Sequence, residues 1–180
     1  MLQLWLNLPK KDRWASPRVQ DLPVNLAPTV ESACVRLKLY SGTLLGVTSP
    51  VQNYTPMIVA DIVMDAGAST ALQIPANYNT FLYVIEGGIS VGEEPEQLNQ
   101  DEVGWLDLFS DTAQSELMIA AREKGGRFVL YAGQPTGDNI VSYGPFIADN
   151  PEEIQDLYKQ YRKGKFDHIS AVPDSQRISF

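Results

Sequence analysis

The sequence predicts a mainly β fold of the barrel or jelly-roll type with one C-terminal α-helix. Between residues 34 and 131, short apolar runs are divided by Gly, Pro and Asn at regular spacing, which is typical of β-sandwiches and barrels. Only the stretch after Asn150 carries both a helical period and helix-capping signals. With 44% hydrophobic residues, a chain of 180 residues can bury one packed core.

The first eight residues alternate Leu with polar or aromatic residues, which predicts a strand. No basic residues precede this run and no continuous apolar segment follows it, so we do not interpret it as a signal sequence. Four prolines, at positions 9, 17, 23 and 28, then predict an irregular arm. We therefore divide the chain into a strand and arm (1–30), a β domain (31–166) and a tail (167–180).

Within the β domain, residues 35–39 alternate apolar and polar side chains, and Cys34 is expected in this strand as a small core residue. Glu86-Gly87-Gly88 and Lys124-Gly125-Gly126 are expected as tight hairpin turns, because glycine adopts positive φ without a Cβ clash. The remaining expected strands are 57–65, 80–85, 89–92, 105–109, 114–121 and 127–132.

The expected helix begins after Asn150, which can cap it, with Pro151 at the first helical position and Glu153 three residues past the cap. Gly164 is expected to end it. Four apolar or aromatic residues recur at helical spacing, so one face should pack on the β domain; they are Ile154, Leu157, Tyr158 and Tyr161.

Composition excludes several classes of function. The formal charge of -8 and the lack of any basic stripe longer than 162–165 argue against nucleic-acid binding. A single cysteine excludes an internal disulfide and fits a reducing compartment. No apolar stretch approaches the roughly 18 residues that a membrane span needs, so we expect a cytoplasmic protein.

The stretch from Gly67 to Gly87 has the spacing of a known metal motif. Its intervening positions Gln73, Pro75 and Thr80 fall where the cupin metal motif, which this spacing resembles, carries His, His and Glu. The second half of the motif would supply another His, and the closest position in this chain holds Gln114. Neutral amides, proline and hydroxyls are weak ligands for a transition metal, so no metal and no cofactor are expected.

Two longer segments carry a more specific resemblance. The run from Tyr143 to Ile154 (YGPFIADNPEEI) and the end of the helix (YRKGKF) resemble the C-terminal signature of the pirin family, and residues 3–9 (QLWLNLP) resemble the linker after its first cupin. The resemblance covers nearly the whole chain. It implies the second cupin of a bicupin family, whose metal lies in the first cupin, and whose members include quercetin 2,3-dioxygenases and nuclear transcription cofactors.

If the mouth of the barrel holds a small molecule, neutral hydrogen-bonding side chains are the candidates to line it: Gln73, Asn77, Asn79, Tyr83 and Gln114. Asp61 and Asp65 form an alternative acid and base pair, although an exposed strand edge explains them as well. His168 is the only histidine and lies in the tail, so a solvated or interface role is expected.

The leading hypothesis is a pirin-like single cupin that is not catalytic and serves as a binding or assembly module. It is expected to form a homodimer through the N-terminal strand and arm, because an unpaired amphipathic strand needs a partner. The alternative is part of a quercetinase-like bicupin that is active only with a separate metal-bearing cupin chain. A metal-free isomerase or a binder of small sugars or acids is the third hypothesis.

Overall fold

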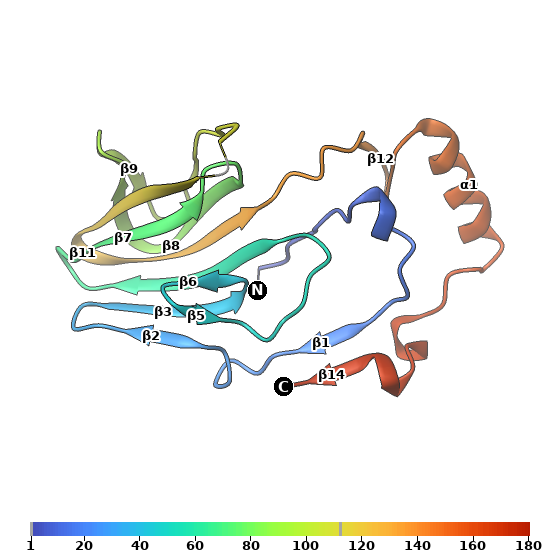
Figure 1. Ribbon diagram of the computed structural model, residues 1–180, viewed down its shortest axis with the longest axis horizontal. Helices are drawn as coiled ribbons and strands as arrows, with labels where there is room; N and C mark the ends of the chain where they lie inside the picture. The colour runs from blue at the N-terminus through green and yellow to red at the C-terminus, as the bar shows by residue number, and fades with distance from the viewer. Residues whose placement is uncertain (1, 112) are drawn as a thin grey trace. The chain divides into compact units, whose positions relative to one another are not determined.

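The structure is a computed structural model that describes residues 2–111 and 113–180. The chain forms two compact units (Figure 1). One unit consists of the chain up to Asp21 together with Thr136–Ser179, and the other consists of Leu22–Pro135 with Phe180. Most regular structure is β and the described residues contain one α-helix, which confirms the predicted fold class.

The larger unit is an eight-stranded sheet. Its main path runs β10-β8-β11-β6-β3-β2, and β7 and β9 pair with β11 and β8 off this path. Every pairing within it is antiparallel, and a short hairpin of β4 and β5 follows β3. The bounds are β2 (Thr29–Glu31), β3 (Val35–Ser41), β4 (Thr43–Leu44), β5 (Val47–Thr48), β6 (Met57–Met64), β7 (Ser69–Pro75), β8 (Asn79–Val91), β9 (Glu96–Asn99), β10 (Val103–Trp105) and β11 (Gln114–Gly133).

The two expected glycine turns are wrong. Gly87 lies inside β8 and Gly125 lies inside β11, so each pair of expected strands is one long strand (Figure 1). Both glycines have positive φ, and a Cβ on Gly87 would lie 2.2 Å from the carbonyl oxygen of Gly125. The ladder between β8 and β11 shifts register just before Gly126. The glycines therefore permit a bulge where two strands approach closely, not a chain reversal.

The core lies on one face of this sheet. Alternate residues of β3, β6, β8 and β11 point into it, and the largest fully buried side chain is Phe128. Aliphatic side chains make up most of the rest, as the period-2 pattern of a half-buried sheet requires. Cys34 does not join the core. It lies in the turn between β2 and β3 and is exposed, because β3 begins one residue later than predicted.

The smaller unit contains the helix, α1 (Pro151–Arg162), and the hairpin of β12 (Val141–Tyr143) and β13 (Phe146–Ala148). The predicted cap is confirmed, since Asn150 Oδ1 accepts a hydrogen bond from Glu153 N at 2.9 Å. Gly164 follows the helix with a φ of 65°. The helix contacts β12 and β13, so the hairpin covers its apolar face.

The N-terminal segment differs from the prediction. Residues 2–8 form no strand, because no ladder partner pairs with them among the described residues; the first strand is β1 (Val19–Asp21). It pairs in parallel with β14 (Arg177–Ser179), which the sequence did not predict. The 3₁₀ turn η1 (Lys10–Asp12) precedes β1, and the 3₁₀ turns η2 (Ile169–Ala171) and η3 (Asp174–Gln176) precede β14.

An ion cluster ties the N-terminal arm to the segment before α1. Asp149 accepts from Arg13 and lies 3.0 Å from Lys10 Nζ. The hydrogen bonds from Arg13 and then Lys10 hold the pKa of Asp149 below its ordinary value. Of the helices that the structure describes, none has the length and apolar character needed to cross a membrane.

Candidate functional site

The interior of the larger unit is where the residues of the cupin motif would hold a metal. On β7, Leu72 and Ile74 point into the core and are 1% and 3% exposed, whereas Gln73 is exposed. Gln73 and Pro75, two of the three motif positions, therefore do not point into the core, because side chains alternate faces along a strand. The third, Thr80, is buried, and its hydroxyl donates to the carbonyl oxygen of Tyr78 at 3.2 Å.

These residues do not fit a transition metal. The inward positions of β7 carry aliphatic side chains, and the hydroxyl of Thr80 already has an acceptor. Across residues 2–111 and 113–180, no group of three or more His, Cys, Asp or Glu side chains is placed to hold a metal ion. A redox metal needs imidazole or carboxylate ligands, so no reaction step in this interior can be derived through a metal.

The five predicted ligand-lining residues do not gather around one cavity. Gln73 donates to Glu116 at 2.8 Å on the exposed side of the sheet, and Tyr83 donates to Asp101 at 3.0 Å on the outer face. Asn77 lies between β7 and β8, while Asn79 and Gln114 are exposed at strand ends.

One cavity lies beside Thr80, and none of these five residues lines it. It has a volume of about 150 Å³ and is lined at the end of the sheet by other side chains: Ile74, Pro75, Ala76, Tyr78, Thr80, Leu106, Asp107, Phe109, Ser115, Glu116 and Leu117. Small-molecule pockets commonly measure about 300–1,000 Å³. This cavity is therefore too small for a flavonoid-sized ligand without movement.

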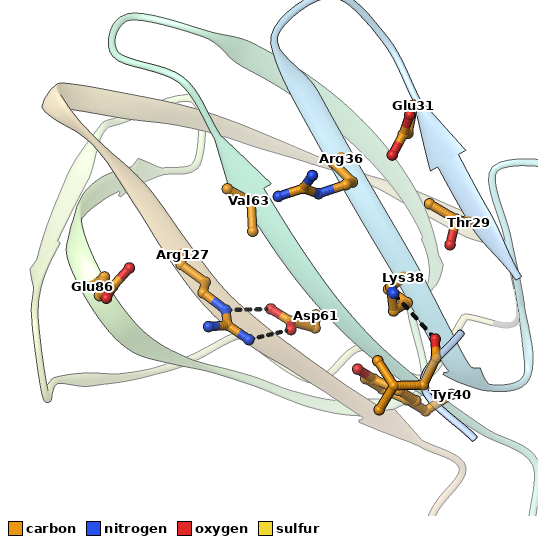
Figure 2. Close-up of a pocket in the computed structure, with 10 residues that line it drawn as sticks. Thr29, Glu31, Arg36, Lys38, Tyr40, Asp61, Val63, Glu86 and Arg127 are labelled. Carbon is orange, nitrogen blue, oxygen red and sulfur yellow. Dashed lines mark hydrogen bonds and ion pairs between the residues drawn. The ribbon is translucent and has the colours of Figure 1, made fainter. Parts of the chain in front are cut away.

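A larger groove lies on the opposite, outer face of the sheet (Figure 2). Its volume is about 840 Å³, and it is lined mostly by charged side chains. Five strands and the turn at Val24 supply the lining: Val24, Thr29, Glu31, Arg36, Lys38, Tyr40, Asp61, Val63, Glu86 and Arg127. Three cations and three carboxylates share it. The groove is therefore locally neutral in a chain that carries a net charge of -8.

An arginine–carboxylate pair lies within the lining of this groove. Arg127 Nε and Nη2 donate to the two carboxylate oxygens of Asp61 at 3.0 and 2.7 Å, which is the bidentate geometry (Figure 2). The hydrogen bond to Asp61 raises the pKa of Arg127 further above its already high value. Lys38 Nζ donates to the carbonyl oxygen of Val24 at 3.1 Å.

The third residue of note is Tyr40. Its half-buried ring lies beside the Asp61–Arg127 pair, and burial, followed by the charge of Asp61, raises the pKa of its hydroxyl. The phenol therefore stays protonated near neutral pH and can donate a hydrogen bond.

The alternation of apolar and polar residues along this strand predicted no role for Arg36, Lys38 or Tyr40. Asp61 was considered only with Asp65, which lies in the turn after β6 and is exposed. Arg127 was missed as its partner because the two residues are 66 positions apart. Only the pairing of β6 with β11 brings them together.

An antiparallel sheet of this strand order, with a buried aliphatic face, has the architecture of a cupin. Residues 59–167 match the family described as the Pirin C-terminal cupin domain. The chain therefore belongs to the pirin family.

Similar proteins support this assignment. The chain is 32% identical over 173 residues to a pirin-like protein of Solanum lycopersicum and 32% identical over 165 residues to pirin of Rattus norvegicus. Each match covers 91% of this chain but only 55% and 56% of those proteins, so the chain spans about half the length of these relatives. A quercetin 2,3-dioxygenase from Acinetobacter baumannii shares the fold, with a TM-score of 0.81 at 23% identity over 92% of this chain and 56% of that one.

Proposed function

We propose that this cupin is a non-catalytic binding or assembly module. The observation that carries the proposal is the aliphatic interior, in which Leu72 and Ile74 occupy the inward positions of β7. Among the described residues, no group of three or more His, Cys, Asp or Glu side chains is placed to hold a metal ion. Binding would then depend on the surface of the unit, where the charged groove offers the polar side chains that the interior lacks.

The assembly part of the proposal rests on the N-terminal segment. Leu2, Leu4 and Trp5 are exposed, and residues 2–8 find no ladder partner among the described residues. Exposed apolar side chains in such a row favour association. We propose that a second copy covers this segment and the arm that follows, which gives a homodimer in the cytoplasm.

The second candidate is a part of a quercetinase-like oxidoreductase. It is favoured by the length of the relatives, of which this chain covers about half, and by the fold shared with a quercetin 2,3-dioxygenase. In that case a separate metal-bearing cupin would supply the redox chemistry. The present chain would supply only contacts to that partner.

Native mass spectrometry of the chain, after incubation with iron, nickel or copper and removal of loosely bound ions, tests both candidates. We expect a metal-free protein with the mass of a dimer, and no turnover of quercetin. Stoichiometric metal on the isolated chain would overturn the non-catalytic proposal. A metal-free monomer at micromolar concentration would overturn the homodimer alone.

Quercetin turnover that appears only when a metal-bearing pirin cupin is added would support the second candidate. A matched control uses that metal-bearing cupin without the present chain. Turnover equal to the control means that this chain contributes nothing to the reaction, which leaves the binding module as the supported function.

A further inference from the structure

One row of side chains crosses the outer face of the sheet at right angles to its strands. The ladder registers place Glu31 opposite Arg36, Arg36 opposite Val63, Val63 opposite Arg127, and Arg127 opposite Glu86. The row is symmetric in charge about Val63. Two arginines flank an apolar residue, and a glutamate stands outside each arginine (Figure 2).

The two arginines keep donors for an external acceptor. Within residues 2–111 and 113–180, Arg36 makes no hydrogen bond or ion pair, and its guanidinium extends toward Val63 in Figure 2. Arg127 uses Nε and Nη2 for Asp61, which leaves Nη1 unused. Asp61 thus fixes the orientation of one guanidinium while the other stays free to adjust.

Two further donors lie at one end of the groove. Lys38 bonds to one backbone carbonyl through Nζ, so two of its three N–H bonds have no such acceptor. The phenol of Tyr40 is protonated near neutral pH. Both residues follow Arg36 at intervals of two on β3, so the three side chains share its outer face.

The spacing suits a small ligand. Arg36 and Arg127 are separated by one intervening strand, so their backbones lie roughly 9–10 Å apart. Arginine side chains leaning over Val63 from both sides can reach the same small molecule, and guanidinium groups match carboxylate and phosphate oxygens in geometry. The apolar floor would contact the carbon skeleton of such a ligand.

We propose that this groove binds a small organic oxyanion, a carboxylate or a phosphate, between Arg36 and Arg127 above Val63. The outer glutamates set its size limit. A compact anion meets the two guanidiniums, whereas an extended polyanion would also meet Glu31 and Glu86, which repel it. This proposal deepens the binding function proposed above, which also depends on the groove; its failure would leave the metal and dimer outcomes of native mass spectrometry unaffected.

Isothermal titration calorimetry of the full chain with succinate and with inorganic phosphate tests the site. We expect saturable binding of at least one probe, and binding of one probe alone identifies the oxyanion chemistry. In Arg36→Gln, affinity should fall about tenfold, the effect of losing one charge-assisted hydrogen bond. Arg36 is exposed, so the variant is expected to fold, which its thermal denaturation checks.

Two matched variants complete the test. Arg162→Gln removes the same charge from exposed α1 and should bind as the original chain does. Glu31→Gln removes a competing carboxylate and should tighten binding about twofold to threefold. The proposal is overturned by a lack of saturable binding of both probes, by equal binding in Arg36→Gln and Arg162→Gln, or by weaker binding in Glu31→Gln.

Discussion

On β3, β6 and β11, most side chains that point inward are apolar, and many of those that point outward are charged. Ile62 and Asp61 are neighbours on β6, yet one belongs to the core and the other to an ion pair in the groove. The charged side chains of the groove thus lie on the face of the sheet opposite the aliphatic core.

The outer face also carries an aromatic row beside the charged groove. Phe81 lies 4.7 Å, between ring centroids, from both Trp105 and Tyr131, and these residues are direct neighbours across β10, β8 and β11. Trp105 remains 71% exposed. The outer face thus combines aromatic and arginine side chains, the types enriched where proteins bind other molecules.

The largest expected effect is the difference in unfolding free energy between histidines placed on the two faces of β7. Leu72→His places a polar ring in the packed interior and should cost about 3 kcal/mol of unfolding free energy. Gln73→His, one residue later on the exposed side, should stay within about 0.5 kcal/mol of the original chain. Urea denaturation measures both, and equal losses would contradict the assigned orientation of β7.

Removal of the groove's ion pair should have a smaller effect. Asp61→Asn leaves Arg127 without its counterion, and we expect a loss of about 1 kcal/mol, because the pair is bidentate but partly solvated. The control Asp65→Asn alters an exposed turn carboxylate and should be nearly neutral. A double-mutant cycle with Arg127→Gln isolates the coupling; additive losses would mean that the pair contributes no stability.

The smallest expected effect is a change in the pKa of Tyr83, which lies on the outer face. The hydrogen bond to Asp101, followed by its charge, raises the pKa of Tyr83. A raised pKa in the folded state gives stability that is complete below the unfolded value of about 10 and is lost as the pH rises through the folded value.

In Asp101→Asn the charge is removed, and Tyr83 should titrate closer to its ordinary value. Asn suits this position, since Asp101 has a φ of 67° and Asn tolerates the left-handed region. NMR of the tyrosine Cζ carbon follows the titration directly. An unchanged Tyr83 pKa would show that the carboxylate does not act on it.

The fold class and the helix were predictable from local signals. Asn150, Pro151 and Glu153 act within one turn of the chain, so their roles follow from the sequence alone. The glycine pairs at 87 and 125 were misread because a bulge and a hairpin turn require the same positive φ. Nothing local distinguishes the two.

The candidate site was much harder to predict. At three positions between Gly67 and Gly87, the motif spacing finds residues that are not metal ligands. The spacing did not predict that one of them, Gln73, lies on the exposed face of β7. A shift of one residue in register moves every side chain to the other face of a sheet. The pairing of Asp61 with Arg127 depends on two strands that are distant along the chain.

The sequence by itself determined the mainly β fold, the capped helix, the family signature and the shortage of metal-binding residues, because each depends on residue type or on neighbours a few positions apart. Only the tertiary structure decided which face of each strand is buried and which residues meet across the sheet. Glu31, Arg36, Val63, Arg127 and Glu86 form one row because four strand pairings align them. Long-range ladder register is set by the packing of the whole core, which no local pattern contains.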